Sequence, residues 1–140
     1  MNLIKNVKFS YPLTYVSTST GSTGCNVVDM QGYEGVAFVL QVGSSASTAA
    51  TMHIEAGSSS GCGNAQDLTG TSIISTSTGH TMVIADVYKP THRYVWPIVV
   101  STDESAYSIM AIQYGARVLP ISQSTDVTAN EINIGTTGTA

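Results

Sequence analysis

Short runs in which apolar and polar residues alternate recur along the 140-residue chain, separated by clusters of Gly, Ser and Thr. In the run 51–55, Met52 and Ile54 fall on one side of an extended strand, while His53 and Glu55 fall on the other. This alternation is typical of a strand with one face in a core and one face toward solvent. About eight such runs predict strands, over residues 7–16, 25–30, 36–42, 51–55, 71–75, 81–88, 91–100 and 106–114.

The spacing of these runs predicts the fold class. Turn-forming segments such as Gly57–Gly61 and Lys89-Pro90 interrupt the chain, and turn signals roughly every 8–12 residues are typical of β-sandwiches and barrels. Pro90 has no amide hydrogen to donate, so it belongs in a connection and not inside a sheet. No window has the i, i+3, i+4 apolar spacing of a helix. We therefore expect an all-β protein, an antiparallel β-sandwich of about eight strands with a jelly-roll-like arrangement.

The two ends of the chain differ from its middle. Residues 1–24 end in a run of Gly, Ser and Thr that is typical of a linker, and residues 121–140 contain few large apolar side chains. We therefore divide the chain into an extended N-terminal arm or first strand with a linker (1–24), a β-sandwich (25–120) and a C-terminal tail (121–140). The ends either order against a neighbouring molecule or form an ordinary first strand and a frayed tail.

The strand predicted over residues 91–100 is apolar on both faces. Its even-numbered positions include Tyr94 and Trp96 and predict the side that faces the core, with Trp96 as the largest member. The odd-numbered positions from Val95 to Val99 are apolar as well. Either a partner subunit or a loop or arm of the same chain would cover the second face. Tyr, Trp and Arg are enriched at the centres of protein interfaces, and Arg93 adjoins this strand.

Charge is scarce and unevenly placed. Only 10% of the residues are charged, the net charge is −4, and 36 of the 140 residues are Ser or Thr. No Lys or Arg occurs between Phe9 and Tyr88. A nucleic-acid-binding protein needs a basic surface to neutralise phosphates, so we expect no nucleic-acid partner.

The N-terminal sequence and the two cysteines bear on whether the chain is exported and whether it contains a disulfide. The first nine residues, MNLIKNVKF, lack the apolar segment of a signal peptide, and no run approaches the length of a membrane-spanning helix. We therefore expect that the chain is not exported by means of a signal peptide and that it has no membrane partner. Cys25 and Cys62 are expected to be reduced in such a setting, and a single disulfide between them is the alternative.

The candidate reactive residues form no pattern of a catalytic or metal site. Gly57–Gly61 matches G-x-S-x-G around Ser59, but a nucleophile elbow requires a following helix that the sequence does not predict. His53 and Glu55 share one face of a strand, and we interpret them as a solvent-facing pair because the other two histidines are isolated. We expect no catalysis, no metal and no other cofactor.

Between residues 25 and 120 the segments follow a recognisable order. They are Val28–Gly35, the strands 36–42 and 51–55, the turn Asp67–Gly70, Val83–Val87, Lys89–Val95, and Ile109–Pro120 with Tyr114–Arg117. The most specific of them is Lys-Pro-x-x-Arg-Tyr-Val at Lys89–Val95. In this order the chain resembles the head decoration (cement) proteins of tailed bacteriophages, which are small β-rich virion proteins. Trp96-Pro97 and the longer C-terminal tail depart from the family's pattern.

The resemblance implies a structural protein that binds the outside of a phage head and stabilises the shell by bridging capsid subunits. Its implied partners are the major capsid protein and further copies in a homotrimer. It implies a place on the capsid exterior of the virion after synthesis in the bacterial host cytoplasm. A phage-tail module or a receptor- or carbohydrate-binding β-module is the alternative. The candidate capsid or subunit contacts are Lys5, Lys8, Phe9, Tyr11, Tyr15, Arg93, Tyr94, Trp96 and Arg117.

Overall fold

The structure is a computed structural model that describes residues 2–16, 21–43, 50–75, 80–101 and 106–129. Within these residues all eight predicted strands are present, and two short strands, β2 and β6, are additional. No helix in the described part of the chain is long and apolar enough to cross a membrane. The elements are α1 (Leu3–Asn6), β1 (Lys8–Val16), β2 (Gly21–Gly24), β3 (Val28–Asp29), β4 (Gly35–Val42), β5 (Ala50–Gly57), β6 (Gln66–Asp67), β7 (Ile73–Ile74), β8 (Thr81–Tyr88), β9 (Tyr94–Ser101) and β10 (Tyr107–Tyr114).

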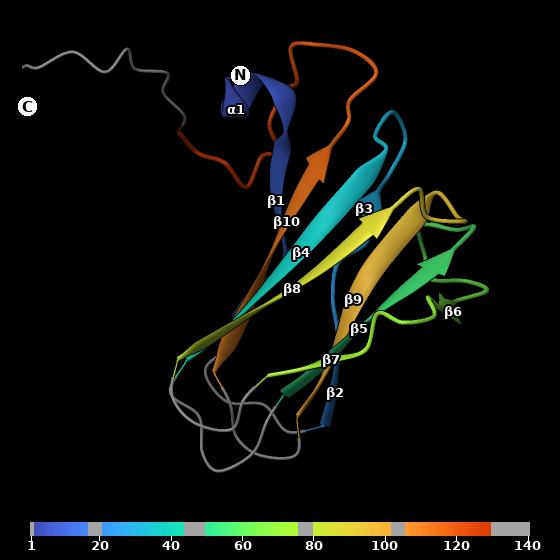
Figure 1. The fold of residues 1–140 in the computed structure, drawn as a ribbon, viewed down its shortest axis with the longest axis vertical. Helices are drawn as coiled ribbons and strands as arrows, with labels where there is room; N and C mark the ends of the chain where they lie inside the picture. Colours follow the sequence, from blue (N-terminus) through green and yellow to red (C-terminus); the bar gives the residue numbers. More distant parts are fainter. Residues whose placement is uncertain (1, 17–20, 44–49, 76–79, 102–105, 130–140) are drawn as a thin grey trace, which may run out of the picture.

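The strands form two antiparallel sheets that face each other (Figure 1). The four-stranded sheet has the order β1-β10-β4-β8, and the six-stranded sheet has the order β2-β9-β5-β6 with β3 beside β9 and β7 beside β5. The chain passes to the other sheet between β1 and β2, β3 and β4, β4 and β5, β7 and β8, β8 and β9, and β9 and β10. Repeated crossing of this kind is the topology of a jelly roll, so the predicted fold class is confirmed.

Alternate residues of the long strands build the core between the sheets. Met52 and Ile54 on β5 are fully buried there, as the alternation predicts, and Phe38 and Leu40 on β4 lie opposite them in the same cluster. The two sheets are also joined by a hydrogen bond of 2.7 Å between the hydroxyls of Thr23 on β2 and Tyr107 on β10.

The prediction for β9 is wrong about which face points inward. Val95 and Val99 belong to the core cluster, and Trp96 does not. Both faces of this strand are apolar, so alternation alone does not decide which one turns to the core. The contacts of Trp96 lie on the outer side of the six-stranded sheet, where its indole Nε1 donates a hydrogen bond of 2.8 Å to Glu55 Oε2.

The N-terminal segment is part of the sandwich. β1 pairs with β10 as an ordinary first strand, which is one of the two readings that the sequence left open. The predicted linker contains β2, which becomes a strand by pairing with β9 although Gly is unfavourable in strands. Residues 17–20 of that linker lie outside the described residues.

The first part of the C-terminal tail is attached to the N-terminal segment. Gln123 donates to the carbonyls of Ile4 and Val7 at 2.7 and 2.8 Å, and its Oε1 accepts from the amide of Phe9 at 3.0 Å. The carboxylate of Asp126 accepts from the amide of Tyr11. The tail therefore covers part of the outer edge of β1, while residues 130–140 lie outside the described residues.

Candidate docking surface

The nine predicted contact residues lie on different parts of the sandwich. Lys5 is in α1, and the contacts from Lys8 to Tyr15 are on β1 at one edge of the four-stranded sheet. Tyr94 and Trp96 are on β9, in the interior of the six-stranded sheet. Arg117 follows β10, and the structure brings it into the same recess as Arg93. These residues therefore do not form one continuous surface.

An apolar surface that the sequence did not single out lies on the outer face of the four-stranded sheet. The register places Met110, Val39 and Ile84 in one row across β10, β4 and β8, and places Ile112 beside Ala37 in the next row. Ile84 is 52% exposed, whereas Val39 in the middle of its row is only 5% exposed. We call this surface, together with Met82 and Tyr88 on β8, the docking face.

The docking face ends at an open sheet edge. β8 pairs with β4 on one side, and in the described part of the chain no strand pairs with its other side. Met82 and Tyr88 on this strand are 63% and 58% exposed. Natural edge strands are usually shortened or protected by charged side chains, Pro or bulges. β8 is eight residues long and has no Pro and no bulge, and its one charged residue is Asp86.

One predicted contact, Tyr15, belongs to the same side of the molecule. It lines a hollow of about 410 Å³ together with Gln41 on β4, Met82 on β8 and Ser108 on β10. Its side chain is 70% exposed, and Tyr11 earlier on β1 is 45% exposed. Tyr15 of β1 and Met82 of β8 therefore flank the same hollow, whereas Tyr11 lines a different recess with Asp29 and Gln113.

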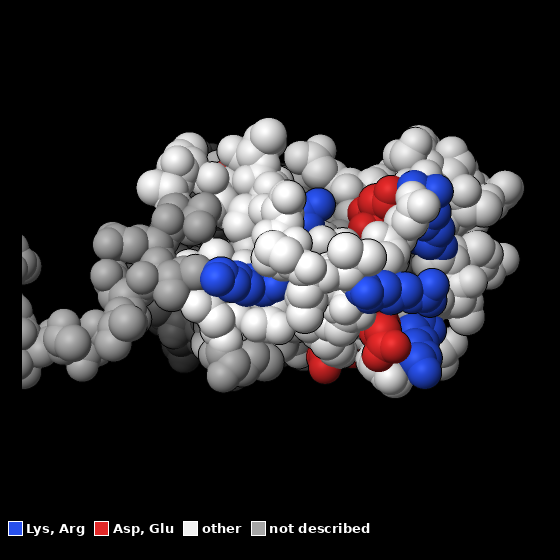
Figure 2. All heavy atoms as spheres, turned by 90° about the horizontal axis from the view of Figure 1, so that it is seen from above, with Lys and Arg blue, Asp and Glu red and all other residues white. Residues whose placement is uncertain are grey.

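The basic residues of the chain gather at one end of the sandwich (Figure 2). β1 begins there, next to the ends of β8 and β10, because Lys8 pairs with Gln113, and Tyr114 and Tyr88 both pair with Gly35. Lys89, Arg93 and Arg117 line a recess of about 520 Å³ at this end. The sequence did not predict this convergence, because the five Lys and Arg residues are spread from position 5 to position 117.

Arg93 is the member of this group with a defined ionic partner. Its Nε and Nη2 donate to the two carboxylate oxygens of Asp29 at 2.8 and 2.7 Å. This paired hydrogen bonding, more than any other cause, holds the pKa of Asp29 below its usual value. The guanidinium also lies 5.0 Å from the centre of the Tyr94 ring. The paired hydrogen bonds to Asp29 therefore position Arg93 at the recess, with its guanidinium beside the Tyr94 ring.

Trp96 is not available to a partner on this structure, although the sequence predicted it as a contact. It is 2% exposed. A Cβ on Gly57 would lie 2.9 Å from the carbonyl oxygen of Gly63 and 3.0 Å from the Trp96 ring, so the loop after β5 and the ring pack tightly together. The same chain therefore covers the outer face of the six-stranded sheet at this position.

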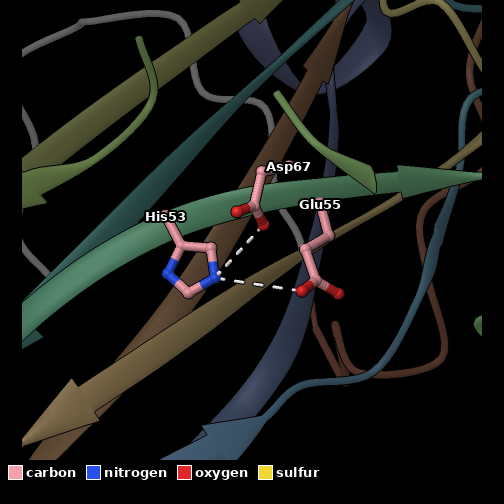
Figure 3. A group of neighbouring side chains, drawn as sticks. All are labelled: His53, Glu55 and Asp67. Atoms are coloured by element: carbon pink, nitrogen blue, oxygen red, sulfur yellow. Dashed lines mark ion pairs between the residues drawn. The ribbon is translucent and has the colours of Figure 1, made fainter. Parts of the chain in front are cut away.

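The structure also shows where the potentially reactive side chains lie. Asp67 on β6 joins His53 and Glu55 on the outer face of the six-stranded sheet, and their ligand atoms lie within 4.8 Å of one another (Figure 3). Sequence analysis missed Asp67, because the pairing of the two-residue strand β6 leaves no periodic signal.

Cys25 and Cys62 are free thiols, and burial raises the pKa of Cys25 to about 12.

Comparison with known proteins identifies solved structures of similar fold. No family model and no curated protein matches the chain. A protein of Bacillus endospore appendages, which form a novel family of disulfide-linked pili, is similar with a TM-score of 0.51 and 12% identity, over 81% of this chain and 92% of that one. The SPBc2 prophage-derived protein YomS is similar with a TM-score of 0.52 and 12% identity, over 77% and 92%. At such identity, the likeness establishes a shared fold.

Proposed function

We propose that the chain is an adhesive structural subunit of a phage particle, which decorates the outside of the head and stabilises the shell by bridging capsid subunits. The docking face is the observation that carries this proposal. Met82 and Ile84 are more than half exposed on a face that continues through Val39 to Met110. Burying such a face against another protein contributes about 25 cal/mol per Å² of apolar area, and exposed apolar patches mark interaction sites.

Attachment of several copies suits a surface of this size. In the proposed homotrimer, three docking faces act together, so that modest contacts add up to durable attachment at high effective concentration. The proposed second partner is the major capsid protein. Lys89 and Arg117 at the basic end make no ion pair with any described residue, so they are free to contact carboxylates on a shell.

The structural neighbours support a coarse role of the same kind. One comes from a spore appendage and the other from a prophage, and a jelly roll that assembles into a particle or filament fits both settings. We propose the capsid exterior of the virion as the location, after synthesis in the host cytoplasm, and binding without catalysis as the activity.

Phage heads that lack this chain provide the test. The purified protein is added to them, bound protein is measured by co-sedimentation, and its position is located by cryo-electron microscopy. We expect regularly spaced density on the outside of the shell. Ile84→Lys introduces a charge on the edge strand of the docking face, beside Val39, and should weaken attachment by at least about tenfold, because the ammonium group must be desolvated.

Val100→Lys is the matched control, because Val100 is 36% exposed and lies on β9, in the other sheet. Circular dichroism checks that both variants keep the β-sandwich. Equal attachment of wild type and Ile84→Lys would contradict the docking face, and density restricted to the tail would contradict decoration of the head.

A filament subunit is the second candidate function. The open edge of β8 would allow sheets of neighbouring copies to pair, and the similar appendage protein forms disulfide-linked pili. The exposed thiol of Cys62 would be available for a link between copies. Negative-stain microscopy of concentrated protein separates the two functions: filaments that shorten in reductant favour this candidate, and discrete trimers that bind heads favour decoration.

A further inference from the structure

The pairing of two strands brings three potential metal ligands together on the outer face of the six-stranded sheet (Figure 3). His53 and Glu55 are two residues apart on β5 and project to the same side. Asp67 on β6 is the direct partner of Glu55 in the antiparallel register. The position of β6 is fixed by a hydrogen bond of 2.9 Å from the amide of Leu68 to the carbonyl of Ile54. The backbone of the sheet therefore sets the spacing of all three side chains.

The distances are close to those of a coordination polyhedron. His53 Nε2 lies 3.9 Å from Glu55 Oε1 and 3.6 Å from Asp67 Oδ1. Ligand bonds of about 2.0–2.1 Å in a tetrahedral site place neighbouring ligand atoms about 3.3 Å apart. Small side-chain movements are therefore enough to bring the three ligand atoms onto one ion.

Glu55 and Asp67 are like charges at directly opposed positions of an antiparallel pair, and this arrangement is unfavourable without a cation. In the described part of the chain, no Lys or Arg is ion-paired with either carboxylate. His53 is the polar neighbour that both share, and it is either a protonated partner or a neutral ligand beside a bound ion.

Trp96 orients Glu55, one of the three potential ligands, through a hydrogen bond. Its indole N–H donates to Glu55 Oε2 at 2.8 Å, which leaves Oε1 as the oxygen nearest His53. The indole is buried and cannot be displaced by solvent. Partners of this kind, which orient a metal ligand, are a regular feature of metal sites. On the open side, His53 and Asp67 border a hollow of about 330 Å³ that has room for water as a further ligand.

We propose that His53, Glu55 and Asp67 bind one divalent transition-metal ion of the Zn²⁺ class. An imidazole nitrogen together with carboxylate oxygens suits Zn²⁺ better than Ca²⁺ or Mg²⁺, which prefer sets of oxygen ligands. The ion neutralises the opposed carboxylates and ties β6 to β5. The site lies on the sheet opposite the docking face, so it is independent of the proposed function.

Zinc titration of the purified full-length chain tests the site. Cys62→Ser serves as the background, because an exposed thiol also binds zinc, while the raised pKa of Cys25 keeps that thiol protonated. Isothermal calorimetry should show one Zn²⁺ per chain, and Ca²⁺ and Mg²⁺ should bind at least about tenfold more weakly. The fluorescence of Trp96, the single tryptophan of the chain, should change with the same midpoint.

His53→Ala and Glu55→Gln should each lower the zinc affinity by about tenfold or more, while His92→Ala, which removes a half-buried histidine at the basic end, should not. Glu55→Gln preserves side-chain volume and so separates loss of a ligand from loss of fold. Unchanged affinity in both ligand variants, loss only in His92→Ala, or the absence of any one-to-one binding would overturn the site.

Discussion

The outer faces of the two sheets both carry large apolar side chains, but these side chains meet different surroundings. On the six-stranded sheet, Trp96 is 2% exposed, because the loop after β5 packs against its ring. On the four-stranded sheet, Ile84 is 52% exposed and sits beside an open edge. The chain thus covers Trp96 with its own loop and leaves Ile84 exposed, which is why we assign the face around Ile84 to a partner.

The edges of the four-stranded sheet differ in the same way. Gln123 and Asp126 accept hydrogen bonds from backbone amides of β1, so the tail protects that edge. β8, at the opposite edge, has no paired strand on its outer side among the described residues. The uncovered face and the open edge adjoin, and together they favour one continuous contact with another molecule.

The largest expected effect is loss of stability when the covered aromatic ring is removed. Trp96→Ala should lower the free energy of unfolding by about 3–5 kcal/mol, because it empties a filled space and removes the partner of Glu55. Urea unfolding followed by far-UV circular dichroism measures this. Ile84→Ala, the matched change on the docking face, should stay within about 0.5 kcal/mol of wild type, as is usual for surface substitutions. Similar costs at the two positions would contradict the difference between the faces.

A smaller loss of stability is expected at Gly35 on β4, whose backbone is covered by the Tyr114 ring. Tyr114 pairs with Gly35 and its ring lies where a Cβ on that glycine would be, so Gly35→Ala must displace the ring. We expect a loss of about 1–3 kcal/mol, as for other overpacked sites. Gly24→Ala is the control, because a Cβ there meets nothing within 4 Å. Equal stability of the two variants in thermal unfolding would show that the ring moves without cost.

The same ring gives a titration that reports on its surroundings. Burial, together with the hydrogen bond of 2.7 Å to Asp86, raises the pKa of Tyr114 to about 12. Asp86→Asn should lower this pKa toward the ordinary value near 10 without reaching it, since burial remains. The pKa of Tyr114 is higher in the folded chain than in the unfolded chain. The protonated phenol of Tyr114 therefore contributes its full stabilisation of the fold below pH 10, and this contribution is lost as the pH rises through 12. Ultraviolet absorbance of the phenolate measures the shift, and an unchanged titration in Asp86→Asn would contradict the contact.

The smallest effect concerns the basic end. Asp29→Asn should cost no more than about 1 kcal/mol at neutral pH, because the side chains of Asp29 and Arg93 are nearly half exposed to solvent. The folded-state pKa of Asp29 lies below its ordinary 3.8. The stabilisation is therefore present above pH 3.8 and disappears as the pH falls through the folded-state pKa. Urea unfolding of wild type and variant should converge in acid, and a gap that persists there would rule out the ion pair as its cause.

The strands could be predicted from the sequence because each long strand carries its own alternation. β5 is the clearest example, with Met52 and Ile54 inward and His53 and Glu55 outward, as the structure confirms. β2 and β6 could not be predicted, since GSTG and QD have no apolar period and become strands only by pairing with β9 and β5.

Faces and sites were harder to predict than strands, for a physical reason. On β9 both sets of alternate residues are apolar, so the alternation does not show that Trp96 lies outside the core and packs near Gly57 and Gly63. On β8 the even residues Met82 and Ile84 are as apolar as their inward neighbours, so the sequence did not mark them as surface. Asp67 lies beside His53, and Arg117 lines the same recess as Arg93. Both arrangements depend on the pairing of strands that are far apart in the sequence.

The most direct test of the central claim is hydroxyl-radical footprinting of the chain, free in solution and attached to phage heads. We predict that Met82, Ile84 and Tyr88, all more than half exposed in the free chain, become protected on the particle. His53 and Val100, on the other sheet, should react equally in both states. Protection of His53 and Val100 with full reactivity of Met82 and Ile84 would contradict the assignment of the docking face.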